Sequence, residues 1–195
     1  MYRDKSTLSA LVVSSSGKAA DYLCGILEEL RFSPVATAVS IADARRRQLE
    51  SPFDLCLINT PLPDDFGIDF AEELCQDSAV GVVLFVKAEL AEQVSYKVED
   101  YGVLTFARPG TRQSITGAVR LAAAMHNRLA AFERRAVKLE AKMKEIRLVN
   151  RAKWLLIDRY NMSEEEAHRY IEKTAMDNCT TRGGIAENII RTYEN

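Results

Sequence analysis

The 195-residue chain has few of the residues from which metal and redox sites are built. It contains two histidines and four cysteines, and Cys24, Cys56, Cys75 and Cys179 form no CxxC pair. Cysteines this far apart, with so few histidines to join them, are typical of reduced thiols in or near a protein core. The sequence therefore predicts no metal site.

Motifs that accompany catalysis are also missing. The sequence has no glycine-rich phosphate loop, no GxSxG nucleophile motif and no cysteine–histidine pair with supporting context. The pair Gly183-Gly184 is too short for a phosphate loop and is interpreted as the start of a helix. We therefore expect a protein that is not an enzyme and that uses no cofactor.

Long apolar runs and leader segments are a third absence. No segment resembles a signal peptide, and no apolar run approaches the roughly 18 residues of a membrane-spanning helix. Apolar residues nonetheless make up 47% of the chain, enough to bury a core in one ordinary domain with an appendage. The sequence predicts a cytoplasmic protein with no membrane partner.

Charge is divided unevenly between the two parts of the chain. Residues 1–111 carry 10 Lys or Arg against 17 Asp or Glu, a net charge of −7. Residues 112–195 carry 16 against 11, a net charge of +5. This division indicates that a polyanion would meet the second part, although a solvated helix with charged faces is the simpler alternative.

The first hundred or so residues alternate short β-rich runs with helical patterns. This alternation predicts an α/β fold with a five-stranded parallel sheet, helices on both faces and the flavodoxin-like strand order 2-1-3-4-5. The expected strands are residues 10–13, 35–39, 55–58, 80–86 and 103–106, and the expected helices are residues 19–30, 41–49, 68–75 and 88–99.

A heptad pattern of apolar residues follows and predicts a long coiled-coil helix. It runs without a break for about five heptads from Ile115 and Ala118 to Asn150. The residues expected to form a dimer seam are Ala122, Met125, Leu129, Phe132, Ala136, Leu139, Met143, Ile146 and Asn150.

The charges that flank this seam favour a parallel homodimer. In that arrangement Arg128 faces Glu133 and Arg135 faces Glu140, while only Lys142 and Arg147 repel each other. An asparagine at position 150 would pair with its twin and fix the register. The alternative is a helix that folds back on the front domain, which the alanines at positions 118, 122 and 136 also suit.

The last 45 or so residues predict a small bundle of three helices. Ser163 and Glu166 have the spacing of a capping box, which starts the second helix. The expected apolar faces are Val149, Ala152, Leu155 and Leu156 on the first helix, Ala167, Tyr170, Ile171 and Thr174 on the second, and Ile185, Ala186, Ile189, Ile190 and Tyr193 on the third.

The order of residues in this bundle resembles the ANTAR domain of bacterial transcription antitermination regulators. The resemblance rests on Ala152-Lys153, Leu156, Ser163-Glu164, Ala167, Ile171, Ala175-Met176, Ala186 and Ile189-Ile190. It implies RNA binding, and it implies that Lys153 contacts the RNA.

The front domain resembles a response-regulator receiver domain, most clearly at residues 54–63, Phe66-Gly67 and 106–109. In that family acidic residues hold Mg²⁺, an aspartate is phosphorylated, and a hydroxyl residue and a lysine contact the phosphoryl group. Here the matching positions, a degenerate phosphorylation site, hold Ser14, Ser15, Asn59, Val86 and Arg108.

Those replacements predict a pseudo-receiver that is not phosphorylated. Mg²⁺ requires hard anionic oxygens, and a carboxamide is a poor nucleophile compared with a carboxylate. The alternative is that Asp64 or Asp65 substitutes for the missing aspartate. The surface of such a domain remains available to a sensor protein, a small ligand or a second copy of the chain.

Basic and aromatic residues on the bundle form the predicted RNA interface. Arg147, Arg151 and Trp154 are expected to share the outer face of the first helix, and Trp154 replaces a residue that is commonly glycine in ANTAR domains. Packing of Trp154 against a neighbouring helix is the alternative. Lys153, by the resemblance, and Arg169, Lys173 and Arg182, on the polar sides of the other helices, would complete the surface. The alternative is that each of these is a solvated surface charge.

These observations predict three segments: a pseudo-receiver over residues 1–111, a coiled coil over 112–147 and an ANTAR bundle over 148–195. The predicted function is antitermination, in which a dimer binds paired stem-loops in nascent leader RNA. The alternative is a signalling scaffold that docks proteins without binding nucleic acid. A DNA-binding regulator fits less well, because no helix-turn-helix is evident.

Overall fold

The structure is a computed structural model that describes residues 7–193. The chain divides into two compact units, one that ends at Ala131 and one that begins at Phe132. The boundary lies within a single continuous helix, α5 (Arg112–Tyr160). Each unit is described by itself.

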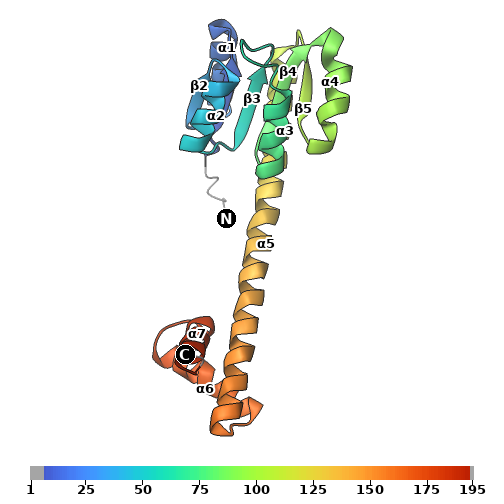
Figure 1. The fold of residues 1–195 in the computed structure, drawn as a ribbon. Helices are drawn as coiled ribbons and strands as arrows, with labels where there is room; N and C mark the ends of the chain where they lie inside the picture. Colours follow the sequence, from blue (N-terminus) through green and yellow to red (C-terminus); the bar gives the residue numbers. More distant parts are fainter. Residues whose placement is uncertain (1–6, 194–195) are drawn as a thin grey trace. The chain divides into compact units, whose positions relative to one another are not determined.

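The first unit is built on a five-stranded parallel sheet with the order β2-β1-β3-β4-β5 (Figure 1). The register places Ser14 at the end of β1 opposite Asn59 at the end of β3, so the carboxyl ends of the central strands lie level. The strands are β1 (Ala10–Ser14), β2 (Val35–Ala38), β3 (Leu55–Asn59), β4 (Gly81–Lys87) and β5 (Leu104–Arg108).

Helices cover both faces of the sheet because the central strands are apolar on both sides. One core joins Leu11, Val13 and the even-numbered residues of β4 to α2, α3 and α4. The other joins Ala10, Val12, Leu55 and Leu57 to α1 and the start of α5. The helices are α1 (Gly17–Glu29), α2 (Ile41–Glu50), α3 (Ile68–Asp77) and α4 (Ala91–Val98), with 3₁₀ turns η1 (Ala88–Leu90) and η2 (Glu99–Tyr101) beside α4.

The flavodoxin-like fold and the strand order predicted from the sequence are confirmed. Serines start two of the helices, since Ser16 caps α1 and Ser40 caps α2 through their side-chain oxygens. Gly67 starts α3 with φ +92°, a left-handed backbone that favours glycine. The residues that start these three helices are therefore the types expected at helix N-termini.

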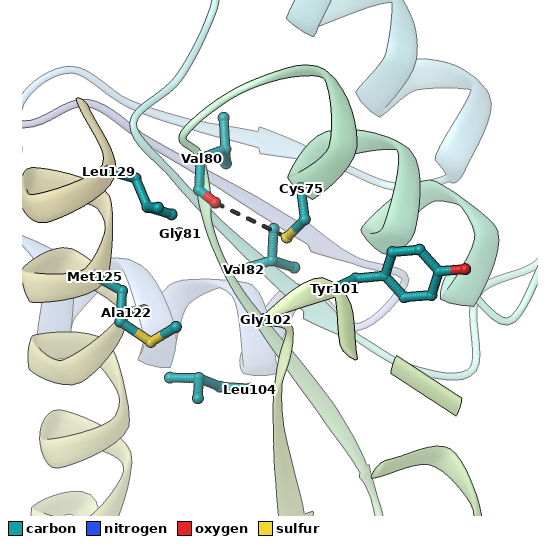
Figure 2. A pocket seen from close by; sticks show the side chains of 10 residues that line it. All are labelled: Cys75, Val80, Gly81, Val82, Tyr101, Gly102, Leu104, Ala122, Met125 and Leu129. Carbon is teal, nitrogen blue, oxygen red and sulfur yellow. Dashed lines mark hydrogen bonds between the residues drawn. The ribbon is translucent and has the colours of Figure 1, made fainter. Parts of the chain in front are cut away.

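The first part of α5 packs on the sheet and belongs to this unit. Ile115, Val119 and Ala122 are buried against the sheet. Gly81 permits a close approach, because a Cβ at this position would lie 2.5 Å from the backbone oxygen of Ala122 (Figure 2). The hollow left beside this contact, near Met125, has a volume of only about 30 Å³. This is room for about one water molecule and not for a metabolite.

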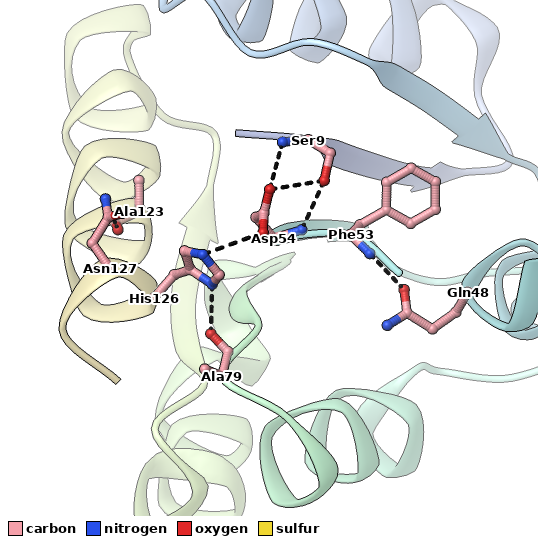
Figure 3. Close-up of polar contacts among 8 residues, drawn as sticks. All are labelled: Ser9, Gln48, Phe53, Asp54, Ala79, Ala123, His126 and Asn127. Carbon is pink, nitrogen blue, oxygen red and sulfur yellow. Dashed lines mark hydrogen bonds and ion pairs between the residues drawn. The ribbon is translucent and has the colours of Figure 1, made fainter. Parts of the chain in front are cut away.

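A buried histidine fixes the next turn of α5 (Figure 3). The Nδ1 atom of His126 lies 2.7 Å from the carbonyl oxygen of Ala79, and its Nε2 atom lies 3.3 Å from Oδ1 of Asp54. The other carboxylate oxygen of Asp54 accepts hydrogen bonds from the backbone N–H and the hydroxyl of Ser9. Polar contacts thus connect α5 to the segments that precede β1, β3 and β4.

The second unit is a bundle formed by the rest of α5, α6 (Glu164–Asp177) and α7 (Arg182–Tyr193). Ser163 and Glu166 form the predicted capping box, with hydrogen bonds of 3.2 and 2.8 Å. The core consists of Ala152, Leu156, Ala167, Ile171, Ala175, Ile185, Ala186 and Ile189.

The apolar face predicted for α6 is wrong at one position. Tyr170 is 45% exposed, and Ala175 is buried in the core instead. Four of the eight core residues are alanines (Ala152, Ala167, Ala175 and Ala186), which leave little space between the helices, so the Tyr170 ring lies at the edge of the core. Over residues 7–193, none of the helices is long and apolar enough to cross a membrane.

Candidate functional site

The carboxyl edge of the sheet carries the residues of the degenerate phosphorylation site. Asn59 donates a hydrogen bond from Nδ2 to the hydroxyl of Ser14 over 3.0 Å, and both side chains are buried. Ser15 is exposed on the loop beyond, and Val86 is buried in β4. The Ser14 hydroxyl also donates to the carbonyl oxygen of Ser16, so neutral hydrogen-bonded side chains occupy the positions where a receiver domain has acids.

Arg108 lies at the same edge, at the end of β5, but its side chain is engaged. Its guanidinium donates a hydrogen bond to the carbonyl oxygen of Thr60, the residue after Asn59. Burial lowers the pKa of Arg108, and its Nε has no hydrogen-bond partner among the residues that the structure describes. The Arg108 guanidinium therefore contacts the backbone at Thr60 and is not directed at Asn59 as a free cation.

The two acids of the following loop point to other partners. Both carboxylate oxygens of Asp64 accept backbone N–H groups at the start of α2, from Ile41 at 3.0 Å and Ala42 at 2.9 Å. These bonds lower the pKa of Asp64, because they stabilise the charged carboxylate. Asp65 accepts the backbone N–H of Gly67. Within residues 7–193, no three His, Cys, Asp or Glu side chains are grouped as metal ligands.

The outer face of α5 in the bundle presents three of the predicted interface residues. Arg147 and Arg151 are exposed, and Trp154 is 73% exposed, one turn further along. Within the bundle as described, to residue 193, the Trp154 ring is mostly exposed rather than packed on a neighbouring helix. These three side chains share one face, as their spacing predicts.

Lys153 does not share that face. Its side chain is 15% exposed, and its Nζ lies 2.9 Å from Oε1 of Glu164 at the start of α6. This hydrogen bond lowers the pKa of Glu164. The ammonium group implied to contact RNA therefore joins two helices of the bundle in the free protein.

Of the remaining three cations, Arg169 and Lys173 lie one turn apart on α6, whereas Arg182 begins α7. Arg182 at the start of α7 lies 3.2 Å from Glu172 and 3.8 Å from Glu145. Arg169 on α6 pairs with Glu165 one turn away. Lys173 is exposed and makes no ion pair within the described residues, and it lines a surface hollow together with Arg169. The seven predicted residues thus occupy separate patches rather than one continuous surface.

The predicted dimer seam is divided between a buried and an exposed part. Ala122 is 1% exposed and packs on Gly81, so in this structure its side chain is buried in the front domain and does not face a second helix. From Leu129 onward the apolar seam residues face solvent: Leu129, Phe132, Leu139, Met143 and Ile146 are each about half exposed or more. Ala136 and Asn150 are exposed as well.

Sequence reasoning missed one feature of the bundle, a groove lined by three tyrosines. Tyr160 ends α5, Tyr170 lies on α6 and Tyr193 ends α7, and all three line one hollow. The signal in the sequence was the tyrosines at the edges of the apolar faces, where one side of a ring packs and the other remains exposed.

Comparison with known proteins finds a family match for the bundle and a shared fold for the front part. Residues 137–190 match the family model of the ANTAR domain. The front part has the fold of a receiver domain protein from Clostridium thermocellum, at 18% identity and a TM-score of 0.56, over 63% of this chain and 98% of that one. A two component transcriptional regulator AraC from Clostridium phytofermentans is also 18% identical, with a TM-score of 0.57, over 64% and 99%. At this identity the likeness establishes the fold alone.

One relative matches across both parts. The chain is 27% identical over 146 residues to the transcriptional regulatory protein PdtaR of Mycobacterium tuberculosis. The match covers 74% of this chain and 70% of that protein. The resemblances found in the sequence, to a receiver domain and to an ANTAR domain, are therefore confirmed.

Proposed function

We propose that this protein is an RNA-binding transcription antitermination regulator that acts as a homodimer. The match of residues 137–190 to the ANTAR domain carries the proposal, and the similarity to a transcriptional regulatory protein supports it. The proposed ligand is a pair of stem-loops in a nascent leader transcript. Binding would favour an antiterminator over a terminator hairpin, so that polymerase continues.

The charge of the helix that enters the bundle supports a polyanionic ligand. Between Arg128 and Lys153 there are nine basic residues and three acidic ones. The exposed face with Arg147, Arg151 and Trp154 combines cations for phosphate with a ring on which an unstacked base can lie. We therefore assign the first RNA contact to this face.

The ion pair of Lys153 with Glu164 changes the role that we propose for this lysine. Because its ammonium group already pairs with Glu164, RNA would have to compete with that carboxylate. In the proposal Lys153 either positions the start of α6 or exchanges Glu164 for a phosphate when RNA binds. Arg151 is the more direct test of RNA contact, because its side chain is exposed.

Dimerisation through residues 129–150 completes the proposed machinery. An exposed apolar row on a helix is stabilised when a second copy covers it, and the flanking charges suit a parallel pair. Two bundles on one dimer would bind two linked hairpins with a high effective concentration for the second contact. The dimer should therefore prefer paired hairpins to single ones.

The front domain is proposed to regulate without phosphorylation. Asn59 and Ser14 bond to each other, and Asp64 is held at the start of α2, so the acids and the nucleophile of the phosphorylation reaction are not assembled. We propose that residues 1–111 receive a signal from a sensor protein or a small ligand. Residues 112–147 join it to the RNA-binding bundle of residues 148–195.

Salt-dependent RNA binding by the full chain tests the proposal. The probe is a pool of two-hairpin RNAs with randomised loops, from which the best binder is selected. Binding should weaken linearly in a plot of log affinity against log salt, with a slope of about −0.7 to −0.9 per phosphate contact, because counterions are released. Arg151→Ala should weaken binding, whereas Arg159→Ala, on another face of the same helix, is the control for charge alone.

A second pair of variants separates the two parts proposed for Lys153. Lys153→Ala removes the ion pair with Glu164 together with any phosphate contact, whereas Glu164→Gln removes the ion pair alone. If Lys153 contacts RNA, Glu164→Gln should bind RNA at least as tightly as the wild type. Failure to select any RNA in low salt would refute the antitermination proposal and favour the signalling scaffold.

A further inference from the structure

The groove between the ends of the bundle helices has an unusual lining. Its volume is about 610 Å³, and eight of its twelve lining residues are Tyr, Thr or Asn, while none is charged. An apolar helix of a partner protein would require a mostly aliphatic surface. A neutral lining rich in rings, hydroxyls and amides instead suits a flat, uncharged heterocycle with polar edges.

Two of the three tyrosine rings at this groove pack on each other, and the third, Tyr170, is left for a ligand to stack on. Tyr160 and Tyr193 meet edge to face, with centroids 5.7 Å apart and an interplanar angle of 79°, and their hydroxyls are hydrogen-bonded. This pair fixes one wall. Tyr170 is 45% exposed and has no ring partner among the described residues, so it can accept a stacked ring.

Two amides supply hydrogen-bonding groups beside the rings. Asn178 uses Nδ2 to donate to the carbonyl oxygen of Thr174, which leaves its Oδ1 without a partner among the described residues. Asn188 uses Oδ1 to accept from Arg191, which leaves its Nδ2 without a partner in the same sense. One acceptor and one donor match the mixed polar edge of a nucleobase.

Positive charge lies next to the groove and not inside it. A second hollow, of about 440 Å³, shares Tyr160, Met162 and Tyr170 with the groove and adds Arg169 and Lys173. Lys173 makes no ion pair in the described part of the chain. The carboxylate of Glu166 also lines this hollow, but it accepts the backbone N–H of Ser163 over 2.8 Å.

We infer that the groove holds an unpaired nucleobase of the bound RNA, stacked on Tyr170, with the attached phosphate beside Lys173. A neutral ring site adjoining a cation has the polarity of a nucleotide, neutral at the base and negative at the phosphate. The inference rests on the proposed function and adds the unit that the bundle recognises, a nucleotide splayed out of a loop. Asn178 and Asn188 then contribute to the choice of base.

Substitutions at Tyr170 test this site in the full-length protein. The probe is the two-hairpin RNA selected by the wild type from the pool with randomised loops. Tyr170→Leu keeps bulk but removes the flat ring, so affinity should fall about tenfold, as expected for the loss of one base–aromatic stack. Tyr170→Phe keeps the ring and should bind within about twofold of the wild type.

An abasic scan of the same RNA locates the stacked nucleotide. Removing each loop base in turn should weaken binding by the wild type at one position, and at that position Tyr170→Leu should cause no additional loss. Asn188→Ala provides a second variant, which should change the preferred base at that position. Helical content and thermal unfolding check that each variant is folded.

The outcomes separate this inference from the proposed function. If Tyr170→Leu and Asn188→Ala bind like the wild type while Arg151→Ala binds weakly, the groove is not the base site but the RNA-binding function stands. A sedimentation mass that drops in Tyr170→Leu would make the groove a protein contact and overturn the inference. If no RNA is selected at all, both proposals fail.

Discussion

Gly81→Ala should destabilise the front domain, because the added methyl group would push α5 away from the sheet. The added Cβ would lie 2.5 Å from the oxygen and 3.0 Å from the carbon of the Ala122 carbonyl, and 3.1 Å from Cδ1 of Leu55. Since the Ala122 atoms belong to the backbone, no rotamer change relieves the contact, and the helix must shift. Overpacking of this kind costs about 1–3 kcal/mol.

The same substitution at Gly117, which lies in α5 itself, provides a control of opposite sign. A Cβ at Gly117 would meet nothing within 4 Å. Gly117→Ala should therefore stabilise the helix by about 0.5–1 kcal/mol, the usual difference between the two residues. Hydrogen exchange of peptides from β4 and α5, measured on the full chain in increasing urea, reports both changes. If the free energy of opening changes equally in the two variants, or does not change in Gly81→Ala, the close contact between Gly81 and Ala122 is refuted.

Further predictions concern the front domain, the dimer and the bundle. Acetyl phosphate or beryllofluoride with Mg²⁺ should leave the protein unchanged, and an acyl phosphate on Asp64 in a mass spectrum would contradict the pseudo-receiver proposal. Backbone hydrogen bonds lower the pKa of Asp64 in the folded protein. The contribution of this carboxylate to folding stability should therefore be complete above the unfolded carboxyl pKa of about 4 and should be lost as pH falls through the lower pKa of the folded state. Asp64→Asn should remove this pH dependence from an acid-unfolding curve. Replacing Leu129, Phe132 and Leu139 with glutamine should yield monomers in sedimentation, and an unchanged mass would show that residues outside this row hold the dimer. Ala152→Glu should abolish the helical signal of the bundle, because Ala152 is fully buried and a charge there has no partner.

The sequence was sufficient for the fold and for the existence of the bundle. Five apolar runs separated by helical patterns admit few arrangements, and the capping box at Ser163 places the start of α6 to the residue. Periodicity alone could not divide α5, because a heptad row that packs on a sheet and one that packs on a second helix have the same spacing. The burial of Ala122 and its close contact with Gly81 show that this residue belongs to the front domain.

Side-chain partners were the part that the sequence could not supply. The resemblance to ANTAR domains implied that Lys153 contacts RNA, but its partner Glu164 lies eleven residues away across a turn, beyond the reach of any local pattern. Tyr170 was placed in the core because tyrosine counts as apolar in a periodic pattern. Its actual position depends on the small volume left between helices that meet through alanines.

The hydrogen bond between Asn59 and Ser14 has a consequence for the cell that contains this protein. Neither side chain titrates in the physiological range or attracts a divalent cation, so the edge of the sheet stays the same when pH or Mg²⁺ fluctuates. In a cell with many sensor kinases, a carboxylate at this position would be open to unintended phosphoryl donors. If the domain is the pseudo-receiver proposed above, a carboxamide bonded to a neighbouring hydroxyl would insulate it from such phosphoryl donors, and its output would depend on what binds its surface.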